Sequence, residues 1–230
     1  MEIPTAHQTL DLTTIRFPEI QLQMRDAHKL RGYFGNLFRE HSPLLHNHYE
    51  NGEFRNSYPL VQYKVINKTP TLVALDKGAF LLNQLFLKMH ELHIDNHTYP
   101  IHNKLINAQS VEVGHTNQLI RYRFTTRWMA LNQTNHKKYL SATPQQQQDM
   151  LQRILVGNIL SFFKGIDIHL ESHQRLMASV THLKPGTTQF KDNTMLAFGG
   201  EFVVNALLPD NIGLGKSVSR GFGTIQRINP

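Results

Sequence analysis

The sequence predicts an α+β fold of two tandem halves, each built in the order strand, helix, strand, strand, helix, strand. Short runs of alternating apolar residues mark the strands, and apolar residues with a helical period mark helices between them. A chain of 230 residues is long enough for two small domains, each with its own core. This element order is the ferredoxin-like arrangement.

In the first half, residues 1–114, a strand is expected over 10–22, where Pro18 indicates an edge or a bulge. Asp26 predicts the N-cap of a helix that runs to about residue 38. The remaining elements are strands over 60–67 and 71–75, a helix capped by Asp76, and strands near 95–100 and 104–113. Four residues of the Asp76 segment can face a core: Phe80, Leu81, Leu85 and Leu92.

The second half, residues 115–230, begins after a boundary near 114–117 with a strand over 119–129. Thr143-Pro144 begins a helix that ends at Gly165, and the glutamine run 145–148 is its solvated start. Further strands are expected near 175–181, 189–196, 198–207 and 222–228. A glycine-rich segment occupies the position where the second helix should fall.

The composition favours a polyanionic partner. The chain has 24 Lys and Arg against 17 Asp and Glu, a formal net charge of +7, and no cysteine. The absence of cysteine excludes disulfides, zinc–thiolate sites and thiol nucleophiles. No apolar run approaches the ~18 residues that a membrane helix needs, and no export leader is recognisable, so we expect a cytoplasmic protein without a membrane partner.

Two Gly-x-Gly units bracket a basic, hydroxyl-rich insert close to the C-terminus. A P-loop is excluded because Asp210 stands where its first glycine is required, and a dinucleotide fingerprint is excluded by Val218. Glycines permit close backbone approach, so the segment reads as a cradle for phosphates. A glycine-rich β-turn between two strands is an equally good reading of the glycines alone. The candidate RNA-binding residues are Gly213, Gly215, Lys216, Ser217, Ser219, Arg220, Gly221 and Gly223.

Leu214 and Phe222 complete a pattern of Gly-hydrophobic-Gly, five residues, Gly-hydrophobic-Gly. A distant segment carries His46-Asn-His48, followed by Tyr58-Pro-Leu-Val-Gln-Tyr-Lys64. Together these motifs resemble the CRISPR-associated endoribonucleases that cut precursor repeat RNA, the Cas6 family of the RAMP superfamily, in a branch with a His-x-His segment. The resemblance covers essentially the whole chain, and it implies tandem ferredoxin-like (RRM- or RAMP-like) domains with a C-terminal glycine-rich loop.

The resemblance implies a metal-independent endoribonuclease that cleaves CRISPR repeat RNA without a cofactor. His48 is then the principal catalytic residue, His46 its partner, and Tyr58 an orienting or proton-transferring group. Histidine suits both proton-transfer roles because its pKa is ordinarily near ~6.5. Most histidines in a chain are surface or hydrogen-bonding residues. A zinc site is the lesser alternative, since it would need further ligands from the nearby His41, Glu50 and Glu53.

Basic residues outside the loop extend the candidate RNA-binding surface. By the resemblance, Lys29 and Arg31 lie where family members carry basic residues, although a solvated helix face explains them equally well. Arg121, Arg123 and Arg127 alternate along one strand and therefore share one face, which lines either solvent or RNA phosphate. Lys137 and Lys138 read more simply as a solvated loop.

The main competing function is a non-catalytic RAMP subunit that holds guide RNA in a CRISPR effector complex. A generic RRM module ranks last, because the strand around Arg121 lacks the glycine-aromatic core of its RNA-binding motif. The expected partner is CRISPR repeat RNA in the precursor transcript. CRISPR effector or adaptation proteins and a second copy of the chain are further candidates.

Overall fold

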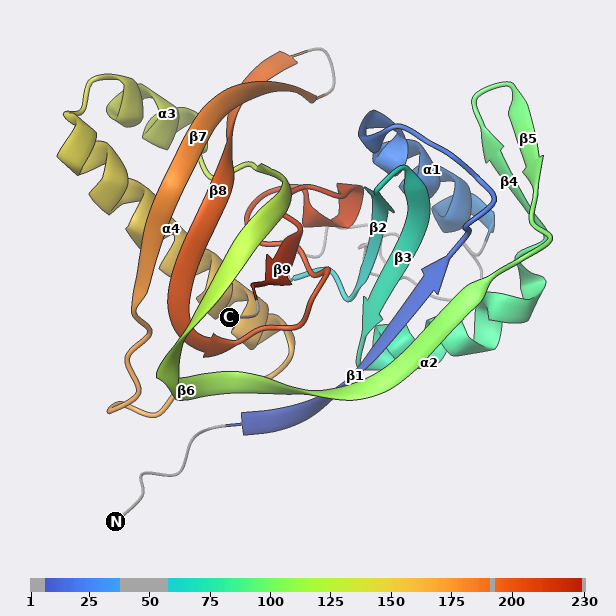
Figure 1. The fold of residues 1–230 in the computed structure, drawn as a ribbon, viewed down its shortest axis with the longest axis horizontal. Helices are drawn as coiled ribbons and strands as arrows, with labels where there is room; N and C mark the ends of the chain where they lie inside the picture. The colour runs from blue at the N-terminus through green and yellow to red at the C-terminus, as the bar shows by residue number, and fades with distance from the viewer. Residues whose placement is uncertain (1–6, 38–57, 191–192, 229–230) are drawn as a thin grey trace, which may run out of the picture. The chain divides into compact units, whose positions relative to one another are not determined.

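The structure, a computed structural model, describes residues 7–37, 58–190 and 193–228 (Figure 1). The chain divides into two compact units. Among the described residues, the N-terminal unit holds Thr9–Val111 together with Ser219–Gly221, and the C-terminal unit holds residues 7–8, Glu112–Val218 and residues 222–228. Both units combine helices with antiparallel strands, which confirms the predicted α+β class.

The N-terminal unit has the sheet order β2-β3-β1-β6, with β4 and β5 as a separate hairpin. Its strands are β1 (His7–Arg16), β2 (Val61–Ile66), β3 (Thr69–Leu75), β4 (Glu91–Ile94), β5 (His97–Pro100) and the first part of β6 (Leu105–Trp128). Its helices are α1 (Ala27–Leu37) and α2 (Lys77–Leu85), accompanied by the 3-10 turns η1 (Met24–Asp26) and η3 (Phe86–Lys88). This order matches the predicted strand, helix, strand, strand, helix, strand sequence, and β5 is the strand predicted over 95–100. The additional strand is β4, so Leu92 reaches the core from β4 and not from the helix in which it was predicted, which ends at Leu85.

Turn chemistry sets the limits of these strands. Asn67 and Lys68 have φ of 50° and 65°, so β2 and β3 are joined by a two-residue turn of the left-handed kind that hairpins favour. The predicted strand over 10–22 is too long, because β1 ends at Arg16. Phe17 still donates its N–H to the carbonyl of Pro70, but Pro18 has no N–H with which to continue the ladder.

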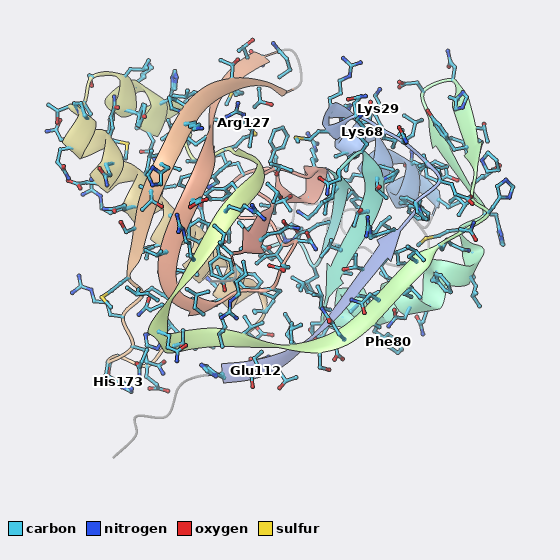
Figure 2. All side chains as sticks on the ribbon, in the orientation of Figure 1. Lys29, Lys68, Phe80, Glu112, Arg127 and His173 are labelled. Carbon is cyan, nitrogen blue, oxygen red and sulfur yellow. The ribbon has the colours of Figure 1, made fainter. Side chains whose placement is uncertain are left out.

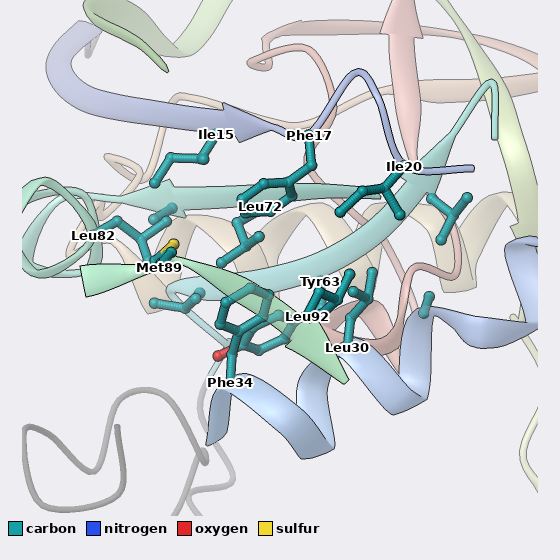
Figure 3. Packing of buried hydrophobic residues seen from close by; sticks show 14 of the residues in the cluster. Ile15, Phe17, Ile20, Leu30, Phe34, Tyr63, Leu72, Leu82, Met89 and Leu92 are labelled. Atoms are coloured by element: carbon teal, nitrogen blue, oxygen red, sulfur yellow. The ribbon is translucent and has the colours of Figure 1, made fainter. Parts of the chain in front are cut away.

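An aromatic and aliphatic core lies between the helices and the sheet of the N-terminal unit (Figure 3). The Phe34 ring of α1 stacks between Phe17 and Tyr63, with centroid separations of 5.9 and 6.1 Å. Leu81, Leu82 and Leu85 of α2 join the same core. Phe80 does not: its side chain is 66% exposed, because it lies on the outer side of α2, so the prediction that it faces the core is wrong (Figure 2).

The C-terminal unit has the sheet order β6-β8-β7, and β9 also pairs with β6. Its further elements are α3 (Gln133–Leu140), α4 (Pro144–Gly165), β7 (Ala178–Phe190), β8 (Asn193–Leu207) and β9 (Ile225–Arg227). The prediction for α4 is confirmed at both ends. Thr143 is its N-cap. Thr143 Oγ1 accepts a hydrogen bond from the Gln146 N–H, and the Thr143 N–H in turn donates to Gln146 Oε1.

Three local predictions in this unit need correction. Lys137 and Lys138 lie in α3 and not in a loop, because Asn132 caps that helix by accepting from the Asn135 N–H at 2.7 Å. The strand expected over 175–181 begins at Ala178 and runs to Phe190 as β7, so it includes residues 189 and 190. The rest of the two strands expected over 189–196 and 198–207 is the single strand β8, which begins at Asn193. The missing second helix is confirmed: between β8 and β9 the described chain contains only the 3-10 turn η4 (Val218–Arg220).

Candidate RNA-binding and cleavage site

The segment from Tyr58 to Lys64 leads into β2 and is buried. Tyr58 is 8% exposed, and its phenol oxygen accepts a hydrogen bond from Gln62 Nε2 at 2.8 Å. Gln62 Nε2 also donates to the Pro59 carbonyl, so this one amide group holds both the Tyr58 phenol and the backbone at the start of the segment. The Tyr58 oxygen is therefore fixed in position, as an orienting or proton-transferring group requires.

Lys64 closes this motif and is completely buried in β2. Burial lowers the pKa of its ammonium group to about 7, because the charged form is poorly solvated there. Lys64 can therefore change its charge near neutral pH, which an exposed lysine cannot do. Sequence reasoning missed this property. The available signal was a lysine directly flanked by Tyr63 and Val65 within an expected strand.

His46 and His48 lie outside the described residues, so their predicted catalytic role is untested, and the same holds for His41, Glu50 and Glu53. Within residues 7–37, 58–190 and 193–228, no group of three or more His, Asp or Glu side chains is arranged to hold a metal ion. In the same ranges, no helix is long and apolar enough to cross a membrane.

The glycine-rich loop is held by backbone hydrogen bonds within the C-terminal unit. The Leu214 N–H donates to the Gly223 carbonyl, the Gly223 N–H donates to the Arg127 carbonyl, and the Lys216 N–H donates to the Met129 carbonyl. Gly215 has a φ of +92°, and a Cβ at this position would lie 2.7 Å from Trp128 Nε1. Packing against the protein itself thus accounts for this glycine, whatever the loop binds.

The polar side chains of the loop are more accessible than its apolar ones. Leu214 and Val218 are buried, whereas Lys216 is exposed and Ser217, Ser219 and Arg220 are partly exposed. The Ser219–Gly221 stretch belongs to the N-terminal unit, where a Cβ on Gly221 would lie 3.0 Å from the Ala27 Cβ. The loop therefore presents its hydroxyl and cationic groups outward while its apolar residues anchor it.

Arg31 of α1 and Arg220 lie close enough to affect each other. Burial lowers the pKa of the Arg31 guanidinium, and the positive charge of Arg220 lowers it further. Two like charges held near each other are stabilised when an anion binds between or beside them. The RNA-binding role of both residues stays a prediction.

Lys29 is already engaged by two carboxylates. Its ammonium group lies 2.9 Å from Asp26 Oδ1 and 2.5 Å from Asp95 Oδ2. Lys29 is labelled in Figure 2. These contacts raise the pKa of Lys29, and the hydrogen bond that Lys29 donates to Asp95 contributes most. A phosphate would have to compete with both carboxylates for this cation.

The arginines of β6 share one face, as predicted. Arg121 and Arg123 are exposed and Arg127 is partly exposed, while Tyr122 and Trp128 are buried on the opposite face. Glu201 of the neighbouring β8 pairs with Arg121, with 2.5 Å between Arg121 Nη2 and the carboxylate. Arg127 (Figure 2) donates weakly to the Lys184 carbonyl. The row is accessible, but part of its charge is neutralised.

A solved structure with the same fold identifies the architecture of this chain. A type IV Cas6 crRNA endonuclease, Csf5, aligns over 96% of this chain and 100% of its own, with a TM-score of 0.61 and 11% identity. The structural likeness confirms the predicted tandem ferredoxin-like architecture. Because the sequence identity is this low, the comparison shows the fold alone. The fold is that of the Cas6 proteins.

Closer comparisons give the family. The Cas6b N-terminal domain family matches residues 8–112, and the Cas6b C-terminal domain family matches residues 114–228. A crystal structure of a Cas6b is 35% identical with a TM-score of 0.88, and one of a CRISPR RNA processing endoribonuclease Cas6b is 29% identical with a TM-score of 0.77. Each covers 96% of this chain and 100% of its own. An uncharacterised protein of Methanocaldococcus jannaschii is 32% identical over 147 residues, 64% of this chain and 99% of that protein. The chain belongs to the Cas6b family.

Proposed function

We propose that this protein is a metal-independent endoribonuclease that binds CRISPR repeat RNA in the precursor transcript and cleaves it to release guide crRNA. The observation that carries the proposal is the match of both Cas6b domain families, which together span residues 8–112 and 114–228. The 29%-identical relative, a CRISPR RNA processing endoribonuclease, supports the same activity.

The reaction needs one base and one acid. A base takes the proton of an RNA 2′-hydroxyl, the 2′-oxygen attacks the adjacent phosphorus, and the bond from phosphorus to the 5′-oxygen breaks as an acid protonates that oxygen. The products are a 2′,3′-cyclic phosphate and a 5′-hydroxyl. His46 and His48 supply the two proton-transfer groups in this proposal, and Tyr58 orients the reacting phosphate.

The position of Tyr58 supports its part in the proposal. Gln62 Nε2 donates to the phenol oxygen at 2.8 Å, which fixes the position of this oxygen. The segment that follows the histidines in sequence thus carries a tyrosine hydroxyl group whose position is set by the fold.

Cleavage in a chelator tests the metal-independent mechanism. Single-turnover cleavage of a cognate repeat RNA should proceed at the same rate in excess EDTA as in Mg²⁺, because the nucleophile, base and acid are all organic groups. Loss of cleavage on chelation, restored by one divalent ion, would contradict the mechanism. Tight binding without cleavage under either condition would favour the non-catalytic RAMP alternative.

The loop cations should contribute to binding more than to chemistry. Lys216→Ala combined with Arg220→Ala should weaken RNA binding and flatten the slope of log affinity against log salt by about one to two units, because each lost phosphate contact removes a released counterion. Lys164→Ala, an exposed lysine in the last turn of α4, is the matched control and should leave the slope unchanged. A salt titration in which the double variant keeps the wild-type slope would remove the loop from the RNA-binding surface.

CRISPR effector or adaptation proteins as partners, a homodimer and a cytoplasmic location stay predictions.

Glycine substitutions in the loop would not test RNA binding cleanly. Gly215 cannot accept a side chain without moving Trp128, so its replacement would disturb the fold as well as the loop.

A further inference from the structure

An open cleft of about 490 Å³ lies in the N-terminal unit between the chain before α1 and the β4–β5 hairpin. We call it the hairpin cleft. Its size is within the ~300–1,000 Å³ of small-ligand sites. Two of its lining residues, Leu22 and Ile94, are buried and form an apolar base. Of the residues that line it, only Lys29 has a role in the RNA-binding surface predicted from the sequence.

One wall of the hairpin cleft is aromatic. In the β4–β5 register, Ile94 pairs with His97 and Leu92 pairs with Tyr99. Directly paired residues share a face of the hairpin, so His97 and Tyr99 lie on the same face as the buried Leu92 and Ile94. Their ring centroids are 4.2 Å apart, and His97 is exposed while Tyr99 is partly buried. The wall therefore offers π surface to a ligand in the cleft.

The shape of the cleft is fixed by the ion pairs of Lys29. Asp26 precedes α1 and Asp95 sits in the hairpin turn, so Lys29 ties the two sides together. Asp26 Oδ2 also accepts the Gln23 N–H at 3.0 Å, which holds the other wall. The cleft is thus organised before any ligand arrives.

The charges that line the cleft cancel. Arg25 and Lys29 are balanced by Asp26 and Asp95, so the cleft has little attraction for a phosphate group. Its uncharged polar groups include the side-chain amides of Gln21, Gln23 and Asn96, which can donate and accept hydrogen bonds. Amides, an aromatic wall and an apolar base suit a flat, uncharged heterocycle that has both donors and acceptors on its edge.

We propose that the hairpin cleft binds one unpaired nucleobase of the RNA substrate. The base stacks on the exposed ring of His97, which Tyr99 supports edge to face, and the amides of Gln21, Gln23 and Asn96 read its edge, as proteins do when they bind unpaired RNA bases. The inference rests on the proposed function for the identity of the ligand. It assigns the cleft to base recognition and leaves phosphate contacts to the loop cations.

An abasic scan of the repeat RNA tests the proposal. In the wild-type protein, removing the base at one unpaired position should weaken binding at least about fivefold, the loss expected for one stacked base. His97→Ala combined with Tyr99→Leu should weaken binding of intact RNA by a similar factor, and the same abasic substitution should then cost nothing further. Leucine keeps apolar bulk at position 99, so the hairpin packing is retained while the π surface is lost.

Phe80→Ala is the matched control, since Phe80 is an exposed aromatic residue of the same unit that does not line the cleft. It should leave both affinity and the abasic penalty unchanged. Wild-type protein that cleaves RNA but shows the same abasic profile as the double variant would overturn the base-binding role and leave the proposed function standing. Wild-type protein that neither binds nor cleaves repeat RNA would overturn the proposed function itself.

Discussion

Replacing His48 by alanine is expected to slow single-turnover cleavage of repeat RNA by at least about 10²-fold. A positioned acid or base contributes roughly 10² to 10⁴ in rate, and alanine removes it completely. RNA affinity should stay within a few-fold of wild type, because proton transfer and phosphate binding use different groups. Rates at saturating protein and binding titrations, measured with the same RNA, separate the two effects.

His46→Ala should cost less than His48→Ala, since the neighbouring histidine can partly substitute for it. His173→Ala is the matched control: His173 is an exposed histidine of the C-terminal unit (Figure 2) and should leave the rate unchanged. If neither His46→Ala nor His48→Ala changes the rate, the catalytic centre lies elsewhere in the chain.

The elements best predicted from the sequence are those marked by local signals, such as capping residues at a helix end or alternation along a strand. Thr143, Pro144 and Gln146 specify the start of α4 through a capping box, which depends on neighbours three residues apart. The face shared by Arg121 and Arg123 follows from strand alternation, which survives the register irregularities of β6. Local signals of this kind do not depend on the rest of the fold.

Predictions failed where tertiary contacts decide which side chains are buried and which residues pair. Phe80 is as apolar as Leu81, and only the direction from which the sheet approaches α2 puts one outside and the other in the core. The ion pair between Lys29 and Asp95 joins residues 66 apart in the chain, which no local sequence pattern predicts.

The glycine-rich loop shows the same limit. Its glycines were recognisable as a motif, yet the reason for Gly215 is the distant Trp128 ring. The hairpin cleft likewise combines residues before α1 with a hairpin some seventy residues later. Sequence motifs thus located the loop, whereas the candidate base-binding cleft became visible only when the fold brought its two walls together.

The most direct test of the proposed mechanism replaces a single 2′-hydroxyl of the RNA. A repeat substrate with one 2′-deoxy nucleotide immediately upstream of the scissile phosphate should bind with wild-type affinity and remain uncut at that bond, because the nucleophile belongs to the RNA. A deoxy substitution several nucleotides away is the matched control and should be cut normally. Cleavage of the first substrate at the same bond would contradict the mechanism and point to an activated water as the nucleophile.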